Sequence, residues 1–167
     1  QSTLGHGSTF YFAIRLPLFD VPDHGFSGDT PQTQAPGNQR RLSGMRLLVV
    51  EDNKINQTVT KRIIEKNNCS CMMVENGFQA IEILSKEVFD AVLMDINMPM
   101  MNGFETTRKI RLKGIKTPII ALTAFGKDEI TEEAISAGMN AIMVKPFEPI
   151  KLFKVITNQI NKTRNAG

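Results

Sequence analysis

Short apolar runs alternate with amphipathic segments over most of the chain, and this alternation predicts strands and helices that follow one another. The apolar runs are Leu47–Val50, Cys69–Val74, Ala91–Met94, Pro118–Leu122 and Ala141–Val144. Helical spacing predicts helices over Lys54–Lys66, Gly77–Lys86, about Gly103–Leu112, about Lys127–Ala137 and around Leu152, Phe153, Ile156 and Ile160. Near-continuous apolar strands need cover on both sides, so we expect an α/β fold with a doubly wound, five-stranded parallel sheet and helices on both faces.

Residues 1–44 have a different pattern. Thr9–Leu18 alternates apolar and polar residues and predicts a half-buried strand, which needs a sheet that this chain does not supply. After it, three prolines and four glycines stand among polar residues, a composition typical of linkers. We therefore expect a fragment of another domain at 1–18, a flexible linker at 19–44 and a folded domain at 45–164. The chain starts with Gln1, so we take it as a piece of a longer protein.

Composition excludes several classes of function. Of 167 residues, 41% are hydrophobic and 22% charged, which is enough to bury a core. No apolar run approaches the roughly 20 residues of a membrane span, and no signal peptide is visible. Two cysteines and two histidines do not make a disulfide framework or a zinc site. A net charge of +3, with the basic Arg108–Lys113 on a predicted helix end, does not favour nucleic acid. We expect a cytoplasmic domain without direct membrane contact.

Polar residues stand where four of the predicted strands end. Glu51 and Asp52 follow the first strand, Asp95 the third, Thr123 the fourth and Lys145 the fifth. Open α/β sheets bind ligands beyond the carboxyl ends of their strands, so these residues should lie together. A lone aspartate there is usually a helix cap and an acidic pair usually faces solvent, but the joint occurrence favours a site.

The chemistry of this set suits a metal ion and a phosphoryl group. Three carboxylates at one edge repel each other unless a cation joins them, and oxygen ligands without histidine or cysteine suit Mg²⁺ or Mn²⁺. Thr123 and Lys145 can neutralise a transferring phosphoryl group, and a carboxylate can act as the nucleophile that receives it.

Four segments at these strand ends resemble the signatures of a response-regulator receiver domain, in the order and at the spacings typical of that family. They are Val49–Asn53, Leu93–Pro99, Ala121–Ala124 and Lys145–Phe147. The resemblance covers about residues 45–162 and implies a flavodoxin-like sheet with the strand order 2-1-3-4-5; that order is taken from the family and not from the spacing.

The resemblance also implies roles for the site residues. Asp95 would be the phosphoryl acceptor, and Asp52 and Asp95 would bind Mg²⁺ together with the main-chain carbonyl of Asn97. Glu51 would hold a metal-bound water, and Mn²⁺ would substitute for Mg²⁺. A receiver catalyses its own Mg²⁺-dependent phosphorylation and dephosphorylation.

Residues around the expected phosphoryl group partly depart from the family. By resemblance, Thr123 and Lys145 contact the phosphoryl oxygens, and Ala124 is small, as the approach of a phosphodonor requires. Ile142 stands where the family often has an aromatic switch residue, so the usual coupling of that residue to Thr123 is in question. Phe125 occupies a position that tunes phosphoryl lifetime in this family, and we expect slow self-hydrolysis.

The start of the chain carries a second resemblance. Gly5–Phe12, followed by Leu16–Leu18, is similar to the end of a histidine-kinase ATP-binding domain. Kinase, linker and receiver in that order form a hybrid histidine kinase, but the other nucleotide-binding boxes are absent here. The implied function is a phosphorelay, from a phosphohistidine to Asp95 and then to a histidine-phosphotransfer protein or to water.

The expected partners are the dimerisation and phosphoacceptor helices of a histidine kinase and a histidine-phosphotransfer protein. We expect them to dock on the polar side of the helix after Asp52. That side is formed by Asn56, Gln57, Thr60 and Lys61, whereas Ile55, Val59 and Ile63 mark the apolar side.

Two other functions compete with the phosphorelay. A receiver-like module that is not phosphorylated could regulate its attached kinase through contacts alone, although all reaction residues are present. A flavodoxin-like flavin binder would need a hydroxyl-rich or glycine-rich loop after the first strand, where Glu51 and Asp52 would repel its phosphate.

Overall fold

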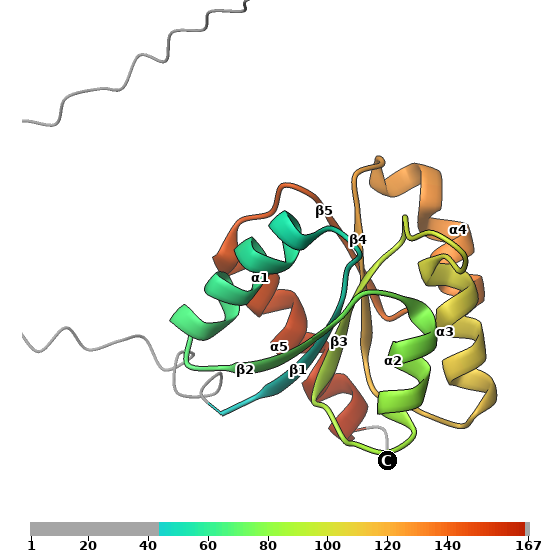
Figure 1. Ribbon diagram of the computed structural model, residues 1–167, viewed down its shortest axis with the longest axis horizontal. Helices are drawn as coiled ribbons and strands as arrows, with labels where there is room; N and C mark the ends of the chain where they lie inside the picture. Colours follow the sequence, from blue (N-terminus) through green and yellow to red (C-terminus); the bar gives the residue numbers. More distant parts are fainter. Residues whose placement is uncertain (1–43, 166–167) are drawn as a thin grey trace, which may run out of the picture. The chain divides into compact units, whose positions relative to one another are not determined.

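The computed structural model describes residues 44–165, which form a parallel sheet flanked by helices (Figure 1). The five strands are β1 (Arg46–Val50), β2 (Ser70–Val74), β3 (Ala91–Asp95), β4 (Ile119–Thr123) and β5 (Ala141–Val144). They pair in the order β2-β1-β3-β4-β5, all parallel, which confirms the predicted flavodoxin-like fold. The fragment expected at 1–18, and all but the last residue of the linker expected at 19–44, lie outside the described residues.

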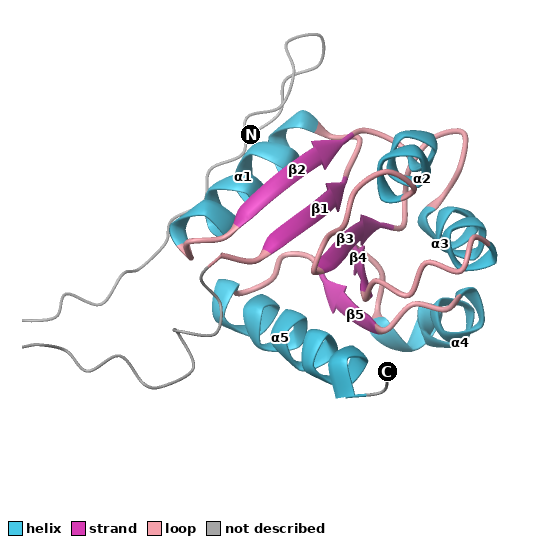
Figure 2. Ribbon diagram, turned by 90° about the horizontal axis from the view of Figure 1, so that it is seen from below, coloured by secondary structure: helices cyan, strands magenta, loops and turns pink. Residues whose placement is uncertain are grey.

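Helices cover both faces of the sheet (Figure 2). On one face lie α1 (Lys54–Lys66) and α5 (Pro149–Asn165), and on the other lie α2 (Gly77–Leu84), α3 (Gly103–Leu112) and α4 (Lys127–Ala137). Alternate residues of β1 pack against the helices on the two faces of the sheet, because successive side chains of a strand point to opposite faces. Leu47 packs in one apolar cluster with residues of α1 and α5, and Leu48 in the other with residues of α2, α3 and α4.

The apolar stripe of α1 faces the core only at Ile63, which is partly buried against the apolar cluster that contains Ile64. Ile55 is 74% exposed and Val59 52%, whereas Thr60 and Ile64 are the buried residues of this helix. Residues four apart drift by about 40° per step around a helix of 3.6 residues per turn, so this stripe begins exposed at Ile55 and winds toward the core by Ile63. The prediction that α1 shows a polar docking side including Thr60 is wrong in this respect, since Thr60 is buried and the exposed side carries Ile55 and Val59.

Two strands differ from the prediction in a way that matters for the site. β3 and β4 each extend one residue further, so that Asp95 and Thr123 are the last residues of their strands. β4 begins at Ile119 and not at Pro118, because proline has no N–H group for the ladder. The Pro118 carbonyl still accepts a hydrogen bond from the N–H of Val92, at 2.8 Å.

Among the helices of residues 44–165, none combines the length and the apolar character that crossing a bilayer requires.

Candidate functional site

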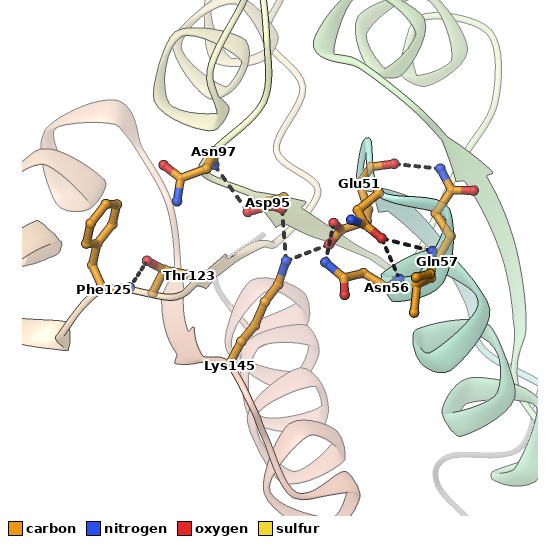
Figure 3. A network of polar contacts seen from close by, with 10 residues as sticks. Glu51, Asn56, Gln57, Asp95, Asn97, Thr123, Phe125 and Lys145 are labelled. Carbon is orange, nitrogen blue, oxygen red and sulfur yellow. Dashed lines mark hydrogen bonds and ion pairs between the residues drawn. The ribbon is translucent and has the colours of Figure 1, made fainter. Parts of the chain in front are cut away.

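The carboxyl ends of β1, β3, β4 and β5 meet at one edge of the sheet, and the polar residues predicted from the sequence gather there (Figure 3). Val50 is in register with Met94, so Glu51 and Asp95 follow on neighbouring strands. The pairing of β1 with β3 therefore brings Glu51 and Asp95 close together, as their positions after two predicted strands imply.

Three carboxylates form a cluster at this edge. Glu51, Asp52 and Asp95 each offer one oxygen, and these oxygens all lie within 4.8 Å of one another. Glu51 is 1% exposed and Asp95 6%, while Asp52 faces solvent. Burial raises the pKa of the Glu51 carboxyl; hydrogen bonds from Lys145 and Asn56 offset this only in part, and the charge of Asp95 adds to the rise. An oxygen-only cluster of this kind can hold a hard divalent cation.

Lys145 bridges two of the three carboxylates. Its Nζ lies 2.5 Å from Oε2 of Glu51 and 2.9 Å from Oδ2 of Asp95. Burial alone would lower the pKa of this amine, but the hydrogen bonds to Glu51 and Asp95 more than compensate and raise it. The side chain therefore stays protonated and holds a positive charge at the centre of the cluster.

The loop after Asp95 packs tightly against the strand end. The N–H of Asn97 donates to Oδ1 of Asp95 at 3.2 Å, so both carboxylate oxygens of Asp95 have a donor. The N–H of Gly103 donates to the carbonyl of Ile96 at 3.0 Å, which brings the start of α3 onto this loop. Asn102 caps α3 in a reciprocal capping box with Glu105 and fixes the entry of the helix.

Thr123 lies at the end of the neighbouring strand, fully buried. Its hydroxyl accepts a hydrogen bond from the N–H of Phe125 at 3.0 Å. In Figure 3, Phe125 lies beyond Thr123 on the side away from Asp95, and the residue is 48% exposed. The hydroxyl that the sequence suggested for phosphoryl contact is thus held by the β4–α4 loop in this structure.

Two residues contribute to the site in a way that sequence reasoning did not identify. The side-chain amide of Asn56 donates to Oε1 of Glu51 at 2.8 Å, and that of Gln57 donates to the main-chain carbonyl of Glu51 at 2.6 Å. The sequence pattern assigns both to a docking surface. The cap at Asn53 places both residues in the first turn of α1, a few residues after the end of β1, and this closeness in the chain is the signal that could have indicated their contact with Glu51.

Comparison with known proteins now decides the family. Residues 47–157 match the model of the response regulator receiver domain. This chain belongs to the receiver domain family. The three clustered carboxylates and the lysine that bridges two of them thus belong to a receiver domain with the predicted fold.

The receiver is similar to parts of much longer sensor kinases. It is 38% identical over 154 residues to the autoinducer 2 sensor kinase/phosphatase LuxQ of Vibrio vulnificus, covering 91% of this chain and 17% of LuxQ. It is 31% identical over 160 residues to the sensor histidine kinase AruS of Pseudomonas aeruginosa, covering 93% of this chain and 15% of AruS. Both alignments extend beyond residues 47–157, and this chain spans only about a sixth of either relative.

A solved structure resembles this receiver in both sequence and fold. The receiver domain of the sensor histidine kinase PA1611 from Pseudomonas aeruginosa is 36% identical and superposes with a TM-score of 0.66, covering 71% of this chain and 99% of that one. That structure is described with a magnesium ion coordinated in its active site cleft.

Proposed function

We propose that this receiver accepts a phosphoryl group from a phosphohistidine onto Asp95, with Mg²⁺ bound at the acidic cluster. The single observation that carries the proposal is the convergence of Glu51, Asp52 and Asp95 within 4.8 Å of one another, with the Lys145 ammonium joined to two of them. Three carboxylates held this close, two of them buried, need more positive charge than one lysine provides.

The donor set fits the metal ion. Asp52 and Asp95 would bind Mg²⁺ directly, with the main-chain carbonyl of Asn97, and Glu51 would act through a water. Oxygen ligands at a partly open edge suit Mg²⁺, which keeps several waters, and Mn²⁺ fits the same set. When bound, the ion would neutralise charge on the phosphoryl oxygens.

The transfer itself is a displacement at phosphorus. A carboxylate oxygen of Asp95 forms the new bond to phosphorus while the bond from phosphorus to the donor histidine nitrogen breaks, and the histidine keeps that electron pair. Lys145 lies 2.9 Å from Asp95 and can follow the phosphoryl oxygens. Thr123 would donate its hydroxyl hydrogen to the same oxygens while its hydroxyl oxygen still accepts from the N–H of Phe125. In transfer onward or in hydrolysis, a second histidine nitrogen or a water oxygen would bond to phosphorus while the bond from phosphorus to Asp95 breaks, and the Asp95 carboxylate would keep that electron pair.

The surface beside the site supports a helical partner. A groove of about 300 Å³ runs between α1 and the loop after β5, with the exposed Val59 in its lining and the exposed Ile55 one residue before Asn56 of that lining. Its lining is formed by Asn56, Val59, Thr60, Ile63, Lys145, Pro146 and Phe147. We infer that a histidine-phosphotransfer protein, or the phosphoacceptor helices of a kinase, docks here through apolar contacts that bring a histidine to Asp95.

We infer the domain context with the support of the relatives. Alignments to LuxQ and AruS that cover more than nine-tenths of this chain support a receiver attached to a kinase, with a kinase remnant at 1–18, a linker at 19–44 and the receiver at 45–164. We place this hybrid kinase in a phosphorelay in which the receiver stands between two histidines.

Intact mass spectrometry after incubation with acetyl phosphate tests the reaction. The wild-type chain should gain the mass of one phosphoryl group in Mg²⁺ and in Mn²⁺ but not in EDTA, and Asp95→Asn should gain none. Asp128→Asn is the matched control, because Asp128 lies in the first turn of α4 and is exposed. A folded wild-type protein that gains nothing, even from a phosphorylated histidine protein, would overturn the proposal in favour of a module that acts by contact alone.

A further inference from the structure

The buried Glu51 carboxylate has a separate donor for each of its oxygens. Oε1 accepts from the side-chain amide of Asn56 at 2.8 Å, and Oε2 accepts from Nζ of Lys145 at 2.5 Å (Figure 3). At 1% exposure, Glu51 has little water to replace either donor. Its orientation is therefore set by two side chains, one from α1 and one from the end of β5.

Asn56 is held firmly enough to act as such a support. Oδ1 of Asn53 accepts hydrogen bonds from the N–H groups of Ile55 and Asn56, at 2.9 and 3.2 Å. Gln57, the next residue, donates its side-chain amide to the main-chain carbonyl of Glu51. The end of β1 and the first turn of α1 are thus tied together by side chains on both sides of Asn56, so the amide reaches Glu51 from a fixed backbone.

We propose that Asn56 is a positioning residue for the metal site, which it serves by fixing the Glu51 carboxylate toward Asp52 and Asp95. The proposal rests on the proposed Mg²⁺ function. Asn56 itself touches neither the metal nor the phosphoryl group; it acts through Glu51. Loss of a residue that hydrogen-bonds to a direct metal ligand typically costs about 10- to 100-fold in metal affinity. Asn56 acts one step further out, because Glu51 would hold a metal-bound water, so we expect a loss at the lower end of this range.

A purely structural role for Asn56 makes a different prediction. If the amide only stabilised the first turn of α1, its loss would lower the melting temperature of the metal-free protein and leave Mg²⁺ affinity unchanged. If it positions Glu51, its loss lowers Mg²⁺ affinity, and that loss depends on Glu51 being present. The dependence on a second residue separates the two roles.

Titration calorimetry with MgCl₂, together with melting temperatures in EDTA, tests the proposal. Asn56→Leu keeps the size of the side chain but removes the donor, and we expect it to weaken Mg²⁺ binding about tenfold. Asn56→Gln keeps an amide on a longer arm and should recover part of the affinity. Thr58→Val is the control, because Thr58 is exposed two residues further along and its hydroxyl bonds within α1, to the carbonyl of Lys54.

A double-variant cycle completes the experiment. In a Glu51→Ala background, where nothing is left to orient, Asn56→Leu should cause no further loss of Mg²⁺ affinity. Full Mg²⁺ affinity in folded Asn56→Leu, or equal losses with and without Glu51, would overturn the positioning role. Those outcomes differ from failure of the proposed function, in which the wild-type chain itself would bind no Mg²⁺.

Discussion

A Cβ atom on Gly103 would lie 2.4 Å from the main-chain oxygen of Asp95. Gly103 is the first residue of α3, and Asp95 is the last residue of β3. The start of this helix therefore approaches the backbone of the acceptor residue more closely than any side chain allows. The neighbour that would have to give way is backbone, which cannot rotate aside as a flexible side chain can.

Gly103→Ala should therefore damage both stability and phosphorylation. The added methyl forces the end of β3 and the start of α3 apart, at a cost of about 1–3 kcal/mol in the free energy of unfolding. Because the shift moves Asp95, labelling by acetyl phosphate should also slow. Urea denaturation and mass spectrometry measure the two effects. Gly126→Ala is the control, since its Cβ would meet only the flexible Glu129 side chain, at 3.1 Å; equal losses in the two variants would contradict the argument.

Glu51→Gln should stabilise the metal-free protein while it weakens Mg²⁺ binding. The pKa of Glu51 is raised from 4.5 mainly by burial, so the folded protein binds this proton more readily than the unfolded chain does. The ionised carboxylate then costs stability at neutral pH, and the cost disappears as the pH falls through the raised pKa toward 4.5. Melting temperatures in EDTA should show a gain for the variant at neutral pH that shrinks in acid.

Glu82→Gln provides a comparison of opposite sign. Glu82 is exposed, and its hydrogen bond with Lys86 lowers its pKa. Its ionised form is therefore the favoured one in the folded state, and removing that charge should bring no gain in melting temperature. A gain of similar size in both variants would show that a general charge effect, and not burial, explains Glu51.

Much of this fold follows from local patterns, because five apolar runs and the helical segments between them fix an α/β architecture. The order of the strands does not follow from periodicity and came from family resemblance. On α1 the apolar spacing predicts one side from Ile55 and Val59, whereas the structure leaves these two exposed and buries Thr60 and Ile64. Apolar spacing marks a stripe but does not tell whether the core or a partner covers it.

The acidic site was predictable as a set of residues but not as a network. Strand ends at one edge place Glu51, Asp95 and Lys145 together in any sheet of this kind. The bond from Asn56 to Glu51 depends on how the first turn of α1 folds back, and the bond from Phe125 to Thr123 depends on a loop conformation. Such contacts depend on backbone angles that residue types alone do not determine.

Acidic residues on the apolar stripe of α1 should block partner transfer and spare the chemistry. Ile55→Asp combined with Val59→Asp should slow phosphoryl transfer from a phosphorylated histidine-phosphotransfer protein at least about tenfold, since a few apolar anchors dominate an interface. Labelling by acetyl phosphate, which needs no docking, should stay unchanged. Val88→Asp, at a residue that is 85% exposed, is the control. Equal transfer rates for the double variant and the wild type would place the docking surface elsewhere.

Arg111→Leu should destabilise the domain without affecting the acidic site. The guanidinium of Arg111 donates to the carbonyls of Ile115, Thr117 and Gly138 and to Oδ1 of Asn140, over 2.7–3.0 Å. Loss of these bonds takes the guanidinium donor from three partly buried carbonyls, at about 1–3 kcal/mol, whereas Oδ1 of Asn140 still accepts from the N–H of Ile119. Urea denaturation should show this loss, while Mg²⁺ affinity measured by calorimetry stays unchanged.

Arg108→Leu is the comparison for Arg111, three residues earlier on the same helix. Arg108 makes an exposed ion pair with Glu133 at 3.2 Å. Surface pairs of this kind contribute about 0–1 kcal/mol, so this variant should stay close to wild type. A loss as large as that of Arg111→Leu would mean that basic charge on α3, and not the bonds of Arg111, stabilises the domain.

Phe125→Ser should shorten the life of the phosphorylated state. Phe125 follows Thr123 by two residues and is bonded to its hydroxyl through the main chain, so a Thr123 that moves toward a phosphoryl group would carry Phe125 with it. A bulky ring brought near Asp95 obstructs water, and a small polar residue would not. The decay of phosphorylated protein, followed by mass spectrometry, should be several times faster in the variant, whereas Phe78→Ser on α2 should not change it. An unchanged decay would show that Phe125 does not shield the acyl phosphate.

The groove beside α1 and the acidic cluster share two side chains, Asn56 and Lys145. An occupant of the groove that changes how these residues hold Glu51 also changes the affinity for Mg²⁺. Thermodynamic linkage then requires Mg²⁺ to alter the affinity for that occupant by the same factor. Docking at the groove and Mg²⁺ binding at the acidic cluster are then thermodynamically coupled. The affinity of a partner for the groove therefore depends on whether the cluster holds Mg²⁺.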